Sequence, residues 1–188
     1  MNIFIDTTNW KLIYILEKDN QIIDQLILEN NKKISDIAIE QLKELLAKNN
    51  LTIQDIKNFY VTQGPGSYTG VRVGLTIVKT LKVLNNDINV FLMNSLQFQA
   101  GNKKVISCLD ARSNKFYAAV FDNNTELTPI EVISLDEIES LQKQYSGFEI
   151  IKDYENIDFS KNFLDTKQYF LKIEDIEQIT PLYIKNFI

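Results

Sequence analysis

Short apolar runs separated by polar turns open the chain. Ile3–Ile5 is the first run, and Leu12–Leu16 and Ile22–Leu28 follow on either side of a polar turn at residues 17–20. Apolar runs of this length that are bounded by turn residues predict a strand followed by a β-hairpin. The run Asn58–Thr62 predicts one more strand in the first half of the chain.

Two longer segments have apolar residues at three- and four-residue spacing, which is typical of amphipathic helices. The first extends from about Lys33 to Lys48 and is ended by Asn49 and Asn50. The second begins after a glycine-rich segment and reaches about Leu84. Strands and helices that alternate in this order predict an α/β fold.

The second half of the chain has a weaker pattern. We expect two subdomains, residues 1–88 and a smaller one at residues 89–188 that is closed by a terminal helix. The elements expected in the smaller one are strands at Val90–Leu92, Val105–Leu109 and Phe116–Phe121, helices at Ser95–Ala100 and Asp136–Tyr145, and the terminal element at Ile176–Ile188.

The glycine-rich segment Gln63–Gly74 holds four of the six glycines of the chain and one of its three prolines. Glycine permits positive φ or the close approach of another backbone, and Ser67 or Thr69 can cap the helix that follows. The same geometry suits an anion at a helix N-terminus, so a structural helix entry and a phosphate site both remain open. Its spacing departs from both the P-loop and the dinucleotide fingerprint, because a P-loop requires Gly-Lys-Ser/Thr where Gly70-Val71-Arg72 stands.

Charge and composition narrow the function classes. The chain has 20 Lys and Arg against 25 Asp and Glu, a net charge of −5, so its overall field repels a nucleic-acid backbone. It has no His, which removes His-based metal sites and catalytic triads, and its single cysteine, Cys108, is expected to be a buried strand residue. No apolar stretch is long enough to span a membrane, so we expect a soluble, cytoplasmic protein.

Four segments together resemble one protein family. The sequence GPGSYTGVRVGLTIVKTL, which begins at Gly64, resembles the signature of the bacterial TsaB (YeaZ) family. The opening strand and turn of that family resemble Asn2–Thr8. A second family element resembles Asp110-Ala111-Arg112 with Phe116-Tyr117, and the terminal motif resembles Pro181–Lys185. The resemblance implies an actin/Hsp70/sugar-kinase-like fold, in which the short helix expected near Gln97–Gly101 makes the second subdomain a shortened one.

The same resemblance implies a function and a set of partners. TsaB proteins are accessory to the formation of threonylcarbamoyladenosine at position 37 of tRNA, in which a TsaD-type subunit performs the transfer and a TsaE-type ATPase is a further component. TsaD proteins carry a His-x-x-x-His metal pair on the first helix, and residues 33–48 here contain no His. The chain is therefore expected to be a non-catalytic subunit without catalytic or metal-binding residues, which contacts tRNA only through the complex.

The resemblance also implies where partners bind. In the family, the two helices form a face that is used either with a second copy or with the TsaD-type subunit, while ATP or ADP is expected only at a subunit junction and not tightly bound. An alternative is that these helices are enclosed in the intramolecular core. The residues expected on the face are Ile34, Ile37, Ala38, Gln41, Leu42, Leu45, Val71, Val73, Gly74, Ile77 and Val78.

A second group of residues is expected near a nucleotide or another anion. After the first strand of kinases with this fold, an acidic residue and its hydroxyl neighbours contact the phosphates and a magnesium-bound water, a role open to Asp6. A purely structural turn at Asp6, and an Asp110–Arg112 pair across a turn, are the alternatives. The residues in this group are Asp6, Thr7, Thr8, Gly64, Gly66, Ser67 and Arg112.

Two other functions compete with the accessory role. A small-molecule ATP-dependent kinase would use Asp6 and the segment Gly64–Gly70 around ATP, although 188 residues are few for two full lobes of that fold. A peptidase would require an activated nucleophile, for which the chain offers neither His nor an evident Ser-Lys arrangement.

Overall fold

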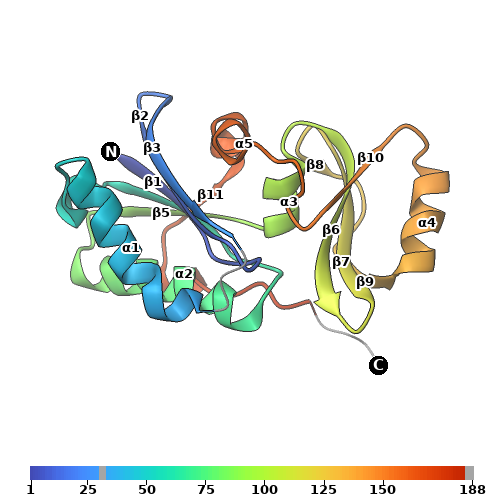
Figure 1. The fold of residues 1–188 in the computed structure, drawn as a ribbon, viewed down its shortest axis with the longest axis horizontal. Helices are drawn as coiled ribbons and strands as arrows, with labels where there is room; N and C mark the ends of the chain where they lie inside the picture. Colours follow the sequence, from blue (N-terminus) through green and yellow to red (C-terminus); the bar gives the residue numbers. More distant parts are fainter. Residues whose placement is uncertain (30–32, 185–188) are drawn as a thin grey trace.

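The computed structural model describes residues 1–29 and 33–184, which form two β-sheets with helices on and between them (Figure 1). The first sheet has six strands in the order β11-β5-β4-β1-β2-β3. β1 pairs antiparallel with β2 and parallel with β4, which in turn is parallel to β5. The strands are β1 (Asn2–Asp6), β2 (Leu12–Lys18), β3 (Gln21–Leu28), β4 (Asn58–Thr62), β5 (Asn89–Met93) and β11 (Leu171–Ile173).

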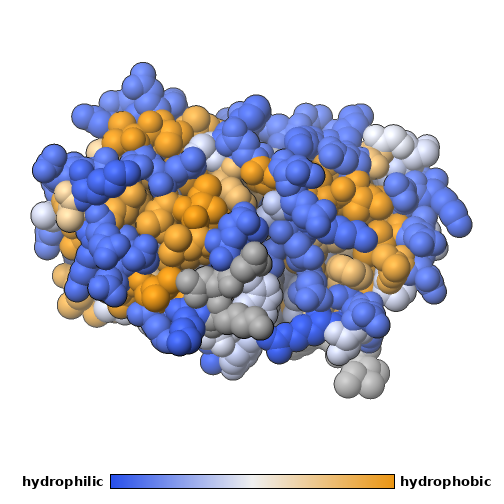
Figure 2. Space-filling view, in the orientation of Figure 1, coloured by the Kyte–Doolittle hydropathy of each residue, from blue (hydrophilic) through white to orange (hydrophobic). Residues whose placement is uncertain are grey.

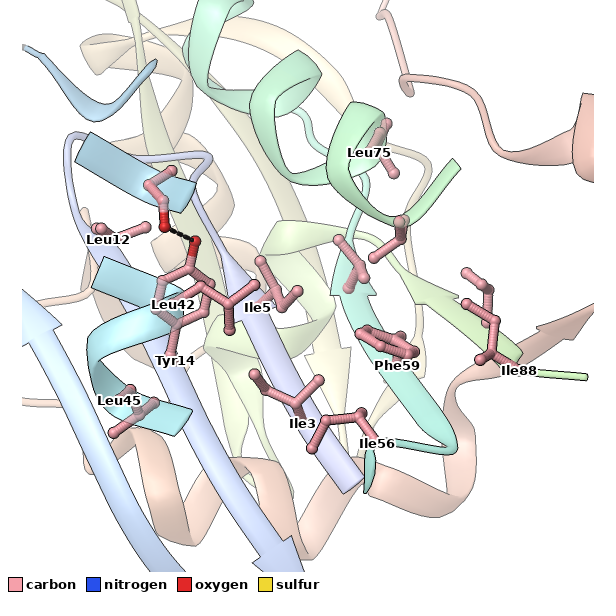
Figure 3. Close-up of a cluster of buried hydrophobic side chains, with 14 of the residues drawn as sticks. Ile3, Ile5, Leu12, Tyr14, Leu42, Leu45, Ile56, Phe59, Leu75 and Ile88 are labelled. Atoms are coloured by element: carbon pink, nitrogen blue, oxygen red, sulfur yellow. Dashed lines mark hydrogen bonds between the residues drawn. The ribbon is translucent and has the colours of Figure 1, made fainter. Parts of the chain in front are cut away.

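Helices α1 (Ile34–Lys48) and α2 (Tyr68–Leu84) cover one face of this sheet (Figure 1). Their inward side chains pack against alternate residues of the strands, among them Ile3, Ile5 and Phe59 (Figure 3). The fully buried Tyr14 on β2 donates its hydroxyl to the carbonyl of Ala38 on α1, over 2.9 Å. Alternate residues of the central strands face the helices, and the residues between them face a second core on the other side of the sheet, so β1 and β2 are buried on both faces. The helices bury one stripe with a period of 3.6 residues.

The second sheet contains β10-β6-β7-β8, and β9 also pairs with β7. Helix α4 covers its outer face, whereas α3 and α5 lie between the two sheets in an aromatic core that includes Phe4, Phe98 and Phe163 (Figure 1). The elements are β6 (Lys104–Arg112), β7 (Lys115–Asp122), β8 (Thr125–Glu126), β9 (Glu131–Ser134), β10 (Glu149–Lys152), α3 (Ser95–Ala100), α4 (Leu135–Gln144) and α5 (Phe159–Thr166).

The division into sheets does not follow the division of the chain at residue 88. β5 and β11 belong to the part expected to form the second subdomain, yet both pair within the first sheet. The terminal helix is also absent from the described part of the terminal segment, where Ile176–Gln178 is a single 3-10 turn and residues 179–184 have no regular structure. The remaining residues of that predicted element, 185–188, lie outside the described residues.

Candidate functional site: a buried turn, an interdomain cleft and a two-helix face

The glycine-rich segment packs directly against the turn that follows β1. A Cβ atom on Gly66 would lie 2.3 Å from the carbonyl oxygen of Thr8, and one on Gly70 would lie 2.1 Å from that of Thr7. The Thr7 hydroxyl donates to the Gly70 carbonyl over 2.6 Å and accepts from the Gly74 N–H over 3.1 Å. Since real Cβ atoms do not approach so closely, these glycines serve contact between two pieces of backbone.

The start of α2 agrees with the predicted cap. The Ser67 hydroxyl accepts a hydrogen bond from the Gly70 N–H over 3.4 Å, and the Ser67 N–H donates to the Thr8 carbonyl over 2.7 Å. Gly64, with φ of +94°, occupies the left-handed region that a glycine tolerates without strain. The segment therefore forms a helix entry that is filled by protein backbone.

Asp6 lies beneath this turn and is 1% exposed. One carboxylate oxygen accepts from the backbone N–H and the hydroxyl of Thr8, both over 2.7 Å, and the other accepts from the Tyr154 hydroxyl over 2.5 Å. Burial raises the pKa of Asp6, and the hydrogen bonds from Tyr154 and Thr8 oppose that rise. Because Tyr154 follows β10, this contact connects the first sheet to the second.

Arg112 lies at a cleft between the two halves of the molecule, with a volume of about 200 Å³. Its guanidinium carbon is 5.7 Å from the centre of the Trp10 ring, within the range of a cation–π contact. Of the two alternatives for Asp110 and Arg112, a contact across the turn is present through the backbone, since the Asp110 carboxylate accepts from the N–H of Arg112 over 2.8 Å. Residues that line the cleft include Gly66, Ser67, Tyr68, Trp10, Arg112 and Tyr117.

The residues predicted near an anion therefore separate into two groups. Gly66, Ser67 and Arg112 meet at the cleft, whereas Gly64 and the turn formed by Asp6, Thr7 and Thr8 are buried. Trp10 and Tyr154 carry no local signal in the sequence, because each contributes through a contact with a residue that is distant in the chain, Arg112 and Asp6 respectively. No group of three or more Cys, Asp and Glu side chains within the described ranges is arranged to hold a metal ion.

A groove runs between α1 and α2 on the face directed away from the sheet. It consists of two adjoining hollows of about 490 and 380 Å³, which share Ile39, Thr76 and Ile77. Figure 2 shows apolar side chains reaching the surface over this part of the molecule. Ile39 is 57% exposed, so a large apolar side chain lies open to solvent at the centre of the groove. The remaining apolar residues of the lining are Ala38, Leu42, Leu46, Leu51, Ile53, Val73 and Leu81.

The residues predicted for a partner face divide by burial. Ile37, Gln41, Val73 and Ile77 are partly exposed. The other predicted residues lie mainly in the core beneath the helices, because the period of 3.6 turns their side chains toward the sheet. This buried group contains Ile34, Ala38, Leu42, Leu45, Val71, Gly74 and Val78, of which Ala38 and Leu42 also border the groove.

Two features of this face lie outside the list of residues predicted for it. Ile39 lies off the buried stripe of α1, and at 57% it is the most exposed aliphatic residue of the groove. Tyr68 and Arg72 contact each other one turn apart on α2, and the spacing i, i+4 is a local signal that could have indicated the pair. Tyr183, which contacts both, is more than a hundred residues away and carries no such signal.

No helix within residues 1–29 and 33–184 is long and apolar enough to cross a membrane.

Comparisons with known proteins agree with this architecture. The family profile described as "TsaD: tRNA N6-adenosine threonylcarbamoyltransferase" matches residues 23–175. A protein of Mycoplasma genitalium, "Uncharacterized protein MG208", is 32% identical over 93% of this chain and 89% of its own length. The "tRNA threonylcarbamoyladenosine biosynthesis protein TsaB" of Bacillus subtilis is 33% identical over 62% of this chain and 53% of its own length.

Solved structures share the fold. The solved structure of YeaZ from Pseudomonas aeruginosa superposes with a TM-score of 0.70 over 97% of this chain and 99% of its own, at 14% identity. A second protein, described as similar to the peptidase YeaZ from Pseudomonas aeruginosa, superposes with a TM-score of 0.76 over 98% and 99% at the same identity. The predicted α/β fold of the actin/Hsp70/sugar-kinase class is confirmed, and the chain belongs to the family that the matching profile defines, with the TsaB (YeaZ) proteins as its relatives there.

Proposed function

We propose that this protein is an accessory subunit in the formation of threonylcarbamoyladenosine in tRNA, and that it binds a TsaD-type transferase through the groove between α1 and α2. The observation that carries the proposal is the exposed apolar lining of that groove in a member of the TsaB (YeaZ) family. Solvent-exposed apolar surface of this kind is typical of sites where another protein binds.

The chemistry of the chain supports a non-catalytic role. It contains no His, and its one cysteine, Cys108, is fully buried, with burial raising the pKa of the thiol to about 12. A thiol of such high pKa is a poor nucleophile at neutral pH. The contribution of the subunit would then be to shape and stabilise its partner, with tRNA reached only through the complex. A TsaE-type ATPase is part of the same proposal, as is a homodimer of the lone chain through the same groove.

The binding face can be tested with one exposed residue. Ile39→Arg places a cation at the centre of the groove without disturbing the core, since Ile39 is 57% exposed. We expect the affinity for the TsaD-type subunit of the same organism to fall by roughly thirtyfold or more, the effect of losing a central interface residue. Co-elution on a sizing column and isothermal titration calorimetry would measure it.

The matched control is Val83→Arg. Val83 is 70% exposed, but it lies on α2 and borders a different hollow near the end of that helix. The Val83→Arg variant should bind the partner with the affinity of the unmodified chain. If the Ile39→Arg variant also binds with that affinity, the groove is excluded as the docking face. Ala38→Arg is unsuitable, because Ala38 is fully buried and its carbonyl accepts from Tyr14, so the variant would test folding.

Nucleotide binding separates the accessory role from that of a kinase. Asp6 is enclosed and hydrogen-bonded to Tyr154 and Thr8, so it offers no free oxygen to a magnesium-bound water. Trp10 is the single tryptophan, is 37% exposed and borders the interdomain cleft, which makes its fluorescence a direct probe.

We expect no saturable change in Trp10 fluorescence when magnesium and ATP are added to the lone chain at micromolar concentrations. If ATP or ADP binds at a subunit junction, a saturable change should require the TsaD-type partner. Tight binding of magnesium and ATP by the lone chain would instead favour the small-molecule kinase. In that case Val83→Arg should retain nucleotide binding and Arg112→Ala should lose it.

A further inference from the structure

Three side chains from two distant segments form an exposed cluster at the first turns of α2. The guanidinium carbon of Arg72 lies 4.0 Å from the centre of the Tyr68 ring, and its Nε donates to the Tyr183 hydroxyl over 2.8 Å. The two tyrosine rings stack with centres 5.9 Å apart. Tyr68 and Tyr183 are 58% and 50% exposed, so the cluster is held together at the surface.

The segment that carries Tyr183 is fixed to the body of the protein. Ile179 is 3% exposed and belongs to the core beneath α2, and the Leu182 N–H donates to the Gln63 carbonyl over 2.7 Å. Tyr183 is therefore presented by an anchored segment. Arg72 is oriented by a ring on one side and a hydroxyl on another, so little of its side-chain entropy remains to be lost on binding.

Within residues 1–29 and 33–184, the hydrogen bond of Arg72 to another side chain is made by its Nε and not by its terminal nitrogens. Among the described residues, none of the carboxylates that form ion pairs does so with Arg72. Arg72 is one of only two arginines in a chain of net charge −5. An oriented guanidinium without a carboxylate is suited to receive one from outside, through two parallel N–H···O bonds.

The position of the cluster connects it to the groove. Arg72 and Tyr68 line the smaller hollow between α1 and α2 together with Val73 and Ile77. On the other side of α2, Arg72 and Tyr183 line a further hollow of about 310 Å³. Arg72 is thus a cation at one end of a docking face whose larger side chains are mainly apolar, while Lys43 is a second cation that lines the larger hollow. A charged contact beside apolar side chains is partly shielded from water.

We infer that Arg72, held by Tyr68 and Tyr183, receives an aspartate or glutamate carboxylate of the protein that docks in the groove. This inference rests on the proposed function and adds the chemistry of the partner: apolar side chains along the groove and one carboxylate at the Tyr68 end. Arginine and tyrosine are the residue types in which interface binding energy concentrates, and a charged pair selects a partner and its orientation.

The first test measures affinity for the TsaD-type subunit as a function of salt. Arg72→Ala should weaken binding by roughly thirtyfold and reduce the loss of affinity between low and high salt, because the screened ion pair is gone. Tyr183→Phe keeps the ring and removes the hydroxyl that orients Arg72, so a smaller loss is expected. Lys103→Ala, which removes one exposed positive charge from the other half of the molecule, should change neither quantity.

The second test identifies the carboxylate. Arg72→Lys keeps the positive charge at this position and introduces a reactive amine. A carbodiimide, which is a zero-length crosslinker, should join that amine to the carboxylate of one Asp or Glu of the partner. Mass spectrometry of the digested complex would locate that residue. Its replacement by Ala in the partner should weaken binding to the unmodified chain but add little to the effect of Arg72→Ala.

The outcomes separate this inference from the function on which it rests. Loss of binding in Ile39→Arg with unchanged affinity and salt dependence in Arg72→Ala would retain the groove and overturn the carboxylate contact. Unchanged binding in both variants, or no complex with the unmodified chain, would overturn the proposed face and this inference together. A crosslink from position 72 to a partner carboxylate, with coupled losses in the two variants, supports the contact.

Discussion

Gly70→Ala is expected to destabilise the protein by about 3 kcal/mol or more, in the opposite direction to helix propensity. Gly70 is a helical residue of α2, where alanine alone would favour the helix by about 1 kcal/mol. The added Cβ would lie 2.1 Å from the carbonyl oxygen of Thr7, however, so the helix would have to move away from the turn after β1. Urea unfolding of the two proteins, followed by circular dichroism, measures the difference.

Gly147→Ala is the matched control for this result. Gly147 has φ of +94° and no atom within 4 Å of an added Cβ, so its replacement tests backbone conformation without a steric contact. It should cost only about 1 kcal/mol. If Gly70→Ala proves as stable as the unmodified protein, the close contact between α2 and the β1–β2 turn is wrong, and the phosphate-site interpretation of the glycine-rich segment gains support.

Asp6→Ala is expected to cost about 3 kcal/mol, because it removes the acceptor of three buried donors. These are the Tyr154 hydroxyl, 2.5 Å from Asp6, and the N–H and hydroxyl of Thr8, each 2.7 Å from it. Burial raises the pKa of Tyr154 well above its ordinary value, so this hydroxyl remains a donor throughout the neutral range. The change would weaken the connection between the two halves, and chemical denaturation at neutral pH would measure it. Asp6→Asn retains the acceptor for Thr8 and should cost less.

The stability that Asp6 contributes should depend on pH, and the direction of that dependence follows from its pKa. Since burial raises the pKa of Asp6 above its ordinary value of 3.8, the folded state holds the proton more tightly than the unfolded state. The associated stability is fully present below pH 3.8 and is lost as the pH rises through the folded-state value. The free energy of unfolding of the unmodified protein should therefore fall relative to that of Asp6→Asn across that window. A constant difference between the two proteins would show that Asp6 is not held in a desolvated site.

Local sequence signals were sufficient to predict most of the helices and strands. The hairpin of β2 and β3 and the helices α1 and α2 follow from apolar spacing bounded by polar turns, and α3 has the predicted limits Ser95–Ala100. The Ser67 cap also follows from local chemistry, since a hydroxyl at that position needs only a backbone N–H three residues later. Such features depend on neighbours in the chain.

The pairing between strands that are distant in the chain could not be predicted from such local signals. β11 joins the first sheet beside β5 although about eighty residues separate the two strands, because backbone hydrogen bonding at a sheet edge carries little sequence specificity. The terminal helix was predicted at Ile176–Ile188. There Ile179 is buried under α2 and the Leu182 N–H is bound to Gln63, so tertiary contacts outweigh the weak local preference for a helix.

The fold class, the family and the glycine-rich entry to α2 could be predicted from residue types at fixed spacing. What lies beside that entry depends on tertiary packing, since the atoms that fill the space beside Gly66 and Gly70 come from Thr7 and Thr8. Tertiary packing likewise separated the buried stripe of α1 and α2 from the exposed groove at Ile39, and brought Tyr183 to Arg72. Spacing specifies which side chains share a face of an element, but what covers that face is set by packing between segments that are distant in the chain.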